Sequence, residues 1–150
     1  MKICFTASSG GHLEELTCLL PIAEGSESFL VTEKSCDNKS AWERTYFLRQ
    51  INRKEKLFIV HFIKLMFRAW KIIKKEKPDY IISTGALITY PFCLIAKLKK
   101  AKVIYIESFA RIDKPSITGR LMYPIADLFL VQWDEMKKFY PKAIFSGGVF

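Results

Sequence analysis

A short polar sequence within Phe5–Leu16 (FTASSGGHLEEL) carries the first residue types that could bind or activate a substrate. An apolar run ends in serines, two glycines follow, and a helical pattern begins at once. Backbone N–H groups of Ser9, Gly10 and Gly11 at the start of a helix could hold a phosphate, because glycine allows close approach and positive φ. The spacing matches neither the dinucleotide-binding fingerprint nor the P-loop. Tight strand-to-helix turns also use glycine without a ligand, so a phosphate site and a structural turn both stay open.

His12, one of two histidines in the chain, ends this polar sequence. A histidine titrates near neutral pH, so at the end of a strand it can act as a general base toward a substrate hydroxyl. It can equally form a hydrogen bond within its own loop and have no further role. A catalytic base and a structural histidine are therefore both compatible with the sequence.

Two further polar turns follow apolar runs. Thr84 and Gly85 come after one run, and the sequence ESFARI places Glu107, Ser108 and Arg111 after another. A carboxylate and a guanidinium at such a turn could bind sugar hydroxyls and a phosphate. Glu107 and Arg111 could instead form a structural ion pair with each other, and both interpretations stay open.

Short apolar runs alternate with longer helical patterns along the chain, and these elements must position the polar turns. The alternation predicts right-handed β-α-β units, and hence a parallel sheet with helices on both faces. Near-continuous apolar runs are typical of buried parallel strands. One Rossmann-like α/β domain is therefore expected over residues 1–150. Strands are expected at 2–7, 28–33, 79–84, 102–108, 127–132 and 143–147, helices at 12–23, 57–77, 88–100, 118–126 and 134–140, and residues 34–56 show no clear period.

The polar turns all follow the carboxyl ends of expected strands. In an open α/β sheet these ends lie along one edge, and ligands bind outside it. The opposite strand ends are mostly Lys, Asp and Pro. Gln132–Asp134 follows a fourth expected strand. The sequence therefore predicts a single functional edge that brings these polar turns together.

The basic charge of the chain is concentrated in one region. The net charge is +9, and Arg44–Lys77 holds eleven Lys or Arg against two acids, Glu55 and Glu76. Such a local excess favours an anionic partner. No RNA- or DNA-binding signature accompanies it, and bulky aliphatic residues interrupt it, so no nucleic-acid partner is expected.

The expected helix at 57–77 carries this charge as one polar stripe on an otherwise apolar surface. That surface is too wide to pack against one side of a sheet. A basic amphipathic helix of this kind can lie in a membrane interface, where each basic side chain adds about 1 kcal/mol on an anionic leaflet. A buried helix with snorkelling lysines is the alternative. The candidate membrane-binding residues are His61, Lys64, Phe67, Arg68, Trp70, Lys71 and Lys75.

The cysteines and apolar runs indicate a cytosolic protein. Cys4, Cys18, Cys36 and Cys93 show neither a C-x-x-C pair nor metal-ligand spacing, so reduced thiols are expected, three of them in the core. The N-terminal apolar run is too short for a signal peptide, and no run is long enough to span a membrane. No Asp-x-Asp motif is present to hold a metal–diphosphate bridge, so neither an active-site metal nor a cofactor is expected.

Three stretches together resemble one known family. They are SSGGHLEEL, PDYIISTGA, and ESFARIDKPSITGRLMYPIADLFLVQWDEM with the following YPKAIFSGGVF. Through them the chain resembles bacterial capsule and exopolysaccharide glycosyltransferase subunits, which are related to the membrane-anchoring subunit of eukaryotic dolichol-linked chitobiose synthase. The resemblance covers nearly the whole chain except about 34–56, and the third stretch is the most specific.

The resemblance implies the N-terminal, acceptor-side domain of a GT-B glycosyltransferase. In that family a separate protein supplies the domain that binds the nucleotide sugar. The pair transfers a sugar from a UDP-sugar to a lipid-diphosphate-linked saccharide at the cytoplasmic face of the membrane, and an inverting reaction is expected. The implied partners are therefore a companion donor-binding subunit, anionic membrane lipid and a polyprenyl-diphosphate-linked sugar. Little activity is expected of this chain alone.

The resemblance also implies roles for the polar turns. Similar one-chain enzymes, such as the peptidoglycan lipid-intermediate GlcNAc transferase, carry a glycine-rich loop that ends in His beside the acceptor and donor phosphates. His12 is then the candidate base, with Glu107 on the same rim as a second catalytic residue. The substrate- or phosphate-binding candidates are Ser9, Gly10, Gly11, Thr84, Gly85, Ser108 and Arg111.

Eukaryotic relatives of that family anchor through an N-terminal transmembrane helix, and no counterpart is expected here. The basic helix at 57–77 is the expected substitute, which implies a peripheral membrane protein. Two alternatives to a catalytic subunit stay open. The chain could be a scaffold that recruits a partner holding every catalytic group, or a free-standing nucleotide-binding protein.

Overall fold

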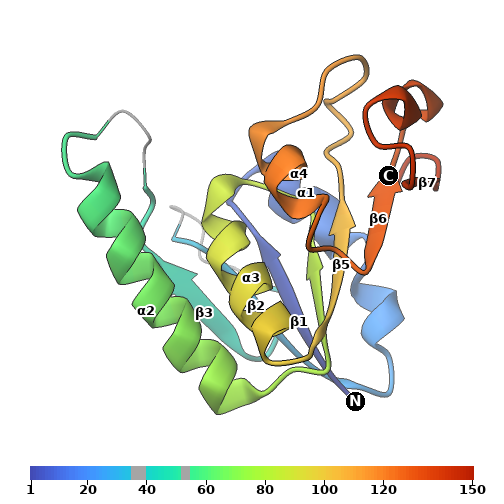
Figure 1. Ribbon diagram of the computed structural model, residues 1–150. Helices are drawn as coiled ribbons and strands as arrows, with labels where there is room; N and C mark the ends of the chain where they lie inside the picture. Colours follow the sequence, from blue (N-terminus) through green and yellow to red (C-terminus); the bar gives the residue numbers. More distant parts are fainter. Residues whose placement is uncertain (35–39, 52–54) are drawn as a thin grey trace.

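The computed structural model describes residues 1–34, 40–51 and 55–150, and within them a seven-stranded parallel β-sheet forms the centre of the fold (Figure 1). The strand order is β3-β2-β1-β4-β5-β6-β7, so β3 and β7 form the two edges. The strands are β1 (Lys2–Ala7), β2 (Glu27–Glu33), β3 (Thr45–Leu48), β4 (Tyr80–Ser83), β5 (Lys102–Ile106), β6 (Leu128–Val131) and β7 (Ile144–Phe145).

Helices cover both faces of the sheet, as the alternation of patterns predicts (Figure 1). The helices are α1 (Gly11–Thr17), α2 (Phe58–Glu76), α3 (Tyr90–Leu98) and α4 (Ile117–Met122), with 3-10 helices η1 (Leu20–Ala23), η2 (Leu87–Thr89) and η3 (Asp134–Lys138). Phe29 and Phe92 belong to the apolar cluster under α2, α3 and α4, whereas Phe5 and Leu16 belong to the cluster under α1. The predicted Rossmann-like α/β fold with helices on both faces is confirmed.

β3 is the strand that the sequence did not predict. It lies within 34–56, where no period is visible, and pairs with β2 in the register Leu30↔Thr45. Four residues are too few to show a period, and three of them are only half-buried because β3 forms a sheet edge. Two parts of the stretch 34–56, residues 35–39 and 52–54, lie outside the described residues.

Several expected helices are shorter than their patterns or of another type. The expected helix at 12–23 is divided into α1 and η1, and Pro21 lies in the first turn of η1. The expected helix at 118–126 ends at Met122, two residues before Pro124, which has no backbone N–H to continue the helical hydrogen bonds, although Tyr123 itself still has helical φ and ψ. The helix expected at 134–140 is the 3-10 helix η3.

The prediction that three cysteine thiols lie in the core is confirmed only in part. Cys4 and Cys93 are buried with free thiols, whereas Cys18 is exposed at the end of α1. Cys36 lies outside the described residues. Two of the three described cysteines therefore fill the core.

The topology brings two of the polar turns side by side. Sequential strands run outward from β1 to β3, and the chain then returns to place β4 on the other side of β1. Ligands bind at such a reversal, outside the carboxyl ends of the strands. His12 follows β1 there, and Thr84 and Gly85 follow β4.

Candidate active site

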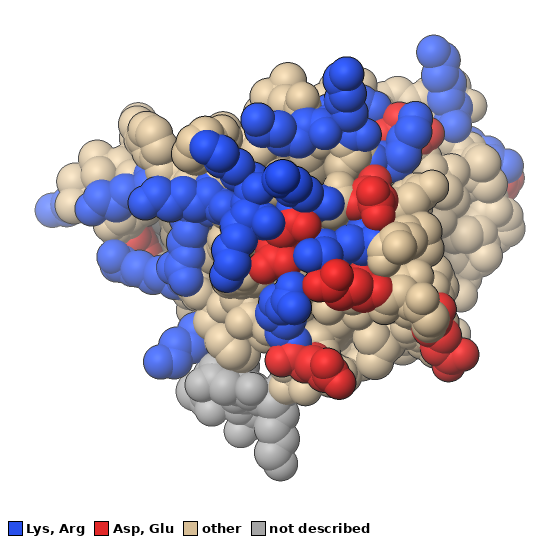
Figure 2. Space-filling view, turned by 90° about the horizontal axis from the view of Figure 1, so that it is seen from below, with Lys and Arg blue, Asp and Glu red and all other residues tan. Residues whose placement is uncertain are grey.

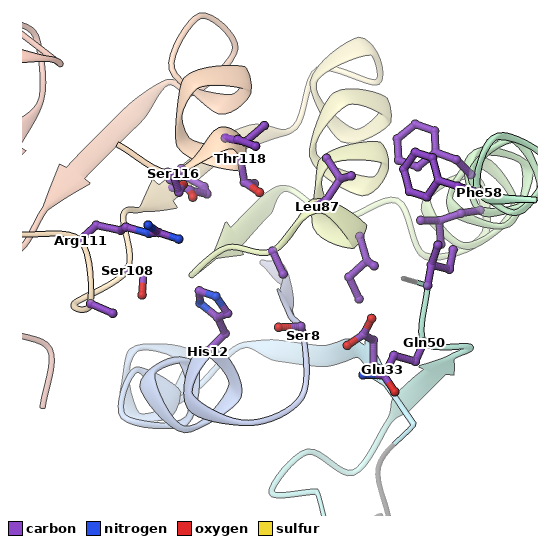
Figure 3. A pocket seen from close by; sticks show the side chains of 18 of the residues that line it. Ser8, His12, Glu33, Gln50, Phe58, Leu87, Ser108, Arg111, Ser116 and Thr118 are labelled. Atoms are coloured by element: carbon purple, nitrogen blue, oxygen red, sulfur yellow. The ribbon is translucent and has the colours of Figure 1, made fainter. Parts of the chain in front are cut away.

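A pocket of about 730 Å³ opens on the predicted functional edge (Figure 3). Its two ends differ in character: Figure 3 shows Arg111 and Ser108 at one end and Phe58 toward the other, with His12 and Ser8 between them and Glu33 and Gln50 on the side of Phe58. The polar wall is formed by Ser8, His12, Ser108, Arg111, Ser116 and Thr118. The apolar wall is formed by Ile51, Phe58, Phe62, Leu65, Leu87 and Ile88. The pocket therefore suits a ligand with a polar part and an apolar part.

His12 is held in the polar wall by two hydrogen bonds with Thr84. The imidazole Nδ1 lies 2.9 Å from the backbone oxygen of Thr84, and the Thr84 hydroxyl donates to the backbone oxygen of His12 at 2.6 Å. Thr84 was predicted to bind substrate, but its hydroxyl is buried and bonded to the His12 backbone. In this structure Thr84 positions the histidine.

The hydrogen bond determines which nitrogen of His12 can act as a base. A carbonyl oxygen only accepts, so Nδ1 must carry the proton and Nε2 keeps its lone pair. Burial lowers the pKa of His12 below its ordinary value of 6.5, and nearby Arg111 lowers it further, against the opposing effects of the Thr84 hydrogen bond and Glu107. His12 is therefore neutral at pH 7, with a nitrogen able to accept a proton.

Gly85 leaves room for this imidazole. Its φ is 121°, and a Cβ at this position would lie 3.1 Å from Cε1 of His12 and 3.4 Å from the Tyr105 hydroxyl. The predicted residue Gly85 thus borders the imidazole at a position where a side chain would crowd it. Gly10 has φ 82° and Gly11 is exposed, and neither lines the pocket.

Glu33, at the end of β2, is a pocket residue that sequence reasoning missed. Burial raises its pKa, while hydrogen bonds from Ser9 and from the backbone of Ile51 act in the opposite direction. The predicted phosphate-binding residue Ser9 therefore holds Glu33 from outside the pocket wall. Glu33 could have been found from the sequence, because it lies at the end of an expected strand on the functional edge.

Ser108 and Arg111 line the pocket as predicted, but Glu107 does not. Glu107 is 1% exposed. Its carboxylate accepts hydrogen bonds from the Tyr140 hydroxyl at 2.9 Å and from the Ser116 backbone at 3.3 Å. The same carboxylate accepts from the Ser108 backbone at 3.2 Å, so it holds together the two ends of the loop that carries Arg111.

No ion pair joins Glu107 to Arg111 among the described residues, so the interpretation as a structural ion pair is wrong, and of the two residues only Arg111 lines the pocket. Arg111 is exposed and forms no ion pair within the described part of the chain. Its guanidinium is therefore available to an anionic group in the pocket. Glu107 anchors the loop and lies beneath the rim on which it was expected.

Glu15 is a second buried carboxylate that fixes this loop. It accepts hydrogen bonds from the side-chain amide of Gln132 and from the backbone of Phe109 at 3.3 Å. The same amide donates to the backbone oxygen of Glu107 at 3.0 Å. Glu15 was not among the candidate residues, because its partner Gln132 is 117 residues away and is not visible in a local pattern.

We expect replacement of Glu15 by Gln to flatten the dependence of stability on pH. Burial raises the pKa of Glu15 from 4.5 to about 7, so the folded state keeps a proton that the unfolded state releases near pH 4.5. The contribution of Glu15 to stability is therefore fully present below pH 4.5 and falls by up to about 3 kcal/mol as the pH rises through 7. Urea unfolding between pH 5 and 8 measures this slope.

The exposed neighbour Glu14 supplies the matched control. Glu14→Gln should keep the wild-type slope, because its carboxylate faces solvent in both states. An equally steep slope in Glu15→Gln and wild type would show that Glu15 titrates alike in both states, contrary to its burial.

One side of α2 packs against the core of the domain, and another side is exposed to solvent. Leu65, Ala69 and Ile73 pack into the core, while a second side of the helix faces outward. We name as the outer ridge of α2 its exposed residues Ile59, Ile63, Phe67 and Trp70. The predicted basic residues Lys64, Lys71 and Lys75 are exposed beside it, as an amphipathic interfacial helix requires.

His61 and Arg68 differ from the other members of the predicted basic stripe. His61 Nδ1 lies 2.9 Å from the Glu55 carboxylate, and Arg68 donates to the backbone oxygen of Phe47 at 2.7 Å. Both side chains therefore help to attach α2 to its neighbours. None of the described helices has the length and apolar composition that a membrane span requires.

The fold of this chain is found in one half of several larger solved proteins. The chain superimposes on MurG of Acinetobacter baumannii with a TM-score of 0.71 at 16% identity, covering 89% of this chain and 42% of MurG. It superimposes on the UDP-N-acetylglucosamine 2-epimerase of Rickettsia bellii with a TM-score of 0.74 at 15% identity, covering 99% and 45%. The chain thus spans less than half of these solved proteins and matches the N-terminal domain of the GT-B architecture. Transferases and epimerases share it, so the fold alone does not choose between them.

Sequence comparison assigns the chain to one family within this shared fold. The chain belongs to the family described as "Oligosaccharide biosynthesis protein Alg14 like", whose sequence profile matches residues 31–149. It is 25% identical to the UDP-N-acetylglucosamine transferase subunit ALG14 of Rattus norvegicus and 26% identical to that of Homo sapiens, in each case over 99% of this chain and 83% of the relative. The ALG14 subunit of Yarrowia lipolytica is 34% identical over 53% of this chain and 39% of its own length.

Proposed function

We propose that this chain is the membrane-associated, acceptor-binding subunit of a two-component UDP-sugar-dependent glycosyltransferase. The acceptor is a saccharide linked to a polyprenyl diphosphate, and the product enters capsule or exopolysaccharide synthesis. The names of the relatives make UDP-N-acetylglucosamine the first donor to test. A companion subunit binds the donor, a division supported by the names of the relatives, which describe them as subunits of a UDP-N-acetylglucosamine transferase.

The unequal ends of the pocket carry this proposal. A lipid-linked diphosphate sugar has a charged head and an apolar tail, and the pocket offers Arg111 and Ser108 at one end and Phe58 and Phe62 at the other. Arg111 and hydroxyl groups can hold a diphosphate without a metal or cofactor. The apolar end adjoins α2, so the tail would leave the pocket toward the outer ridge.

In the proposed reaction His12 is the general base. Its Nε2 accepts the proton of the acceptor hydroxyl as that oxygen attacks the anomeric carbon of the donor, and the bond to UDP breaks from the opposite side, with inversion. Thr84 keeps the imidazole in the required tautomer. Ser108 and Arg111 hold the acceptor diphosphate beside it.

Membrane association would bring the pocket to its lipid-linked acceptor. The outer ridge of α2 exposes large apolar side chains, with Phe67 67% exposed, and lysines lie alongside. Such a helix lies in the headgroup region with its apolar side toward the acyl chains. We therefore place the protein at the cytoplasmic face of the membrane as a peripheral subunit.

We expect Phe58→Ala/Phe62→Ala to weaken binding of long-chain acceptors selectively. The two rings stack at 5.7 Å between centroids in the apolar wall, and loss of their contact with a lipid tail should raise KM about 10- to 30-fold at similar kcat. An acceptor with a one-isoprene tail should show little change. Steady-state kinetics of the two-subunit enzyme with both acceptors measures the difference.

Leu98→Ala, at an exposed position on the opposite edge, is the matched control and should leave both KM values unchanged. An equal effect of Phe58→Ala/Phe62→Ala on both acceptors would contradict a tail-binding role for the apolar wall. A melting curve of each variant separates this result from loss of folding.

A further inference from the structure

A second cavity lies on the edge of the sheet opposite the candidate active site. It has a volume of about 780 Å³ and is formed where α2 and α3 end, beside the amino ends of β4 and β5. Its lining contains a single acidic residue, Asp79, and five lysines. We name as the lysine basin the residues Lys74, Lys77, Lys99, Lys100 and Lys102.

Most of the charge in the lysine basin is not neutralised by the protein. Lys102 pairs with Asp127 at 3.3 Å, but no ion pair among the described residues involves the other four lysines. The Asp79 carboxylate accepts a hydrogen bond from the backbone of Lys2 at 2.7 Å. Figure 2 looks onto this edge and shows Lys and Arg side chains crowding its α2 side. A concave surface of this charge concentrates anions.

Two lysines of the basin occupy backbone positions that favour glycine. Lys77 ends α2 with φ 49°, and Lys100 follows α3 with φ 70°. The left-handed conformation is strained for residues that have a Cβ, and helices usually place glycine there. A lysine near a helix C-terminus does favour the helix dipole, but Lys74 provides that charge to α2 without strain. Both of these left-handed positions border the same cavity.

The lysine basin continues into the outer ridge of α2. The Lys74 ammonium lies 4.7 Å from the centroid of the Trp70 ring, which is itself exposed. Tryptophan and lysine together are typical of the level of lipid headgroups. The lysine basin and the outer ridge therefore form one continuous surface, which is basic at the C-terminal end of α2 and apolar along the rest of the helix.

We propose that the lysine basin binds the phosphates of anionic phospholipid headgroups. The membrane contact then extends from the outer ridge of α2 to the amino ends of β4 and β5. This proposal rests on the membrane association proposed above and adds a headgroup site that is separate from the acceptor pocket. It orients the domain with α2 along the membrane, so that the apolar end of the pocket opens beside the lipid.

The test replaces both strained lysines by glycine. Lys77→Gly/Lys100→Gly should bind vesicles of 30% phosphatidylglycerol in phosphatidylcholine about 10- to 30-fold more weakly than wild type, since each lysine contributes to attraction by the anionic surface. The same variant should melt at an unchanged or higher temperature, because glycine relieves the left-handed strain. Cosedimentation and thermal unfolding measure the two effects.

Lys137→Gln/Lys138→Gln removes the same charge from exposed positions in η3 and should bind within about twofold of wild type. Equal losses in both double variants, or no loss in the glycine variant, would overturn the proposal. Tighter binding of soluble inositol hexakisphosphate than of anionic vesicles would overturn the lipid assignment. If Ile63→Ser/Phe67→Ser loses vesicle binding while the glycine variant keeps it, the proposal that α2 docks on the membrane would stand. Only the proposed headgroup site would then be contradicted.

Discussion

Replacement of His12 by Ala should reduce sugar transfer by the complete two-subunit enzyme about 100-fold or more, with the loss in kcat. The reason is that Nδ1 is committed to the Thr84 carbonyl, which leaves Nε2 as the proton acceptor in the polar wall. Since the pKa of His12 is lowered, the acid limb of the kcat/KM profile should lie below pH 6.5 in wild type. That limb should disappear in His12→Ala.

Two further variants distinguish a loss of the base from a general loss of activity. Thr84→Val removes the hydroxyl that bonds the His12 backbone and should give a smaller loss of about 10-fold, because the base is loosened but present. Cys18→Ser, exposed at the end of α1 outside the pocket lining, should keep full activity. Wild-type turnover in His12→Ala would assign all proton transfer to the companion subunit and favour the scaffold interpretation.

Replacement of Glu107 by Ala should destabilise the protein by about 3–5 kcal/mol. The change leaves the buried Tyr140 hydroxyl and the Ser108 and Ser116 backbone N–H groups without their acceptor. The proximity of Glu107 adds to burial in raising the pKa of Tyr140, as expected for a hydroxyl beside a carboxylate. Urea unfolding at pH 7 measures the loss.

Glu135→Ala, at an exposed position in η3, is the control and should change stability by less than about 0.5 kcal/mol. A Glu107→Ala variant that unfolds like wild type yet has lost turnover would contradict the anchoring role and restore Glu107 as a catalytic group. A variant that is destabilised but active at low temperature would support the buried network.

The parallel sheet and its functional edge could be predicted because they depend on local patterns. Each long central strand is an apolar run, and the edge follows from the direction of parallel strands. His12, Ser108 and Arg111 meet in one pocket for this reason. β3 has no such pattern, since its pairing with β2 and not its own composition makes it a strand.

The roles of the buried carboxylates could not be predicted, because their partners are distant in sequence. Glu107 is bonded by Tyr140, and Glu15 by Gln132. From the sequence Glu107 was a candidate catalytic residue at the end of a strand, and Glu15 was not a candidate at all. The meeting of polar turns beside one pocket was therefore predicted correctly, while the distinction between groups that face the pocket and groups that support it required the fold.

The charge of the lysine basin likewise could not be predicted from local sequence patterns. Along the sequence the basic excess lies within Arg44–Lys77, and the rest of the chain is nearly neutral. The fold places Lys99, Lys100 and Lys102 beside the end of α2, which extends the basic surface beyond the helix that sequence analysis singled out.

The most direct test of the central claim is transfer of radiolabelled sugar from UDP-N-acetylglucosamine to a polyprenyl-diphosphate-linked acceptor. The assay compares this chain alone, the companion subunit alone, and both together on acceptor-containing vesicles. The account predicts transfer that appears or rises sharply only when both subunits are present. Transfer by this chain alone would show that it contains its own donor site and would contradict the division of the enzyme into two subunits.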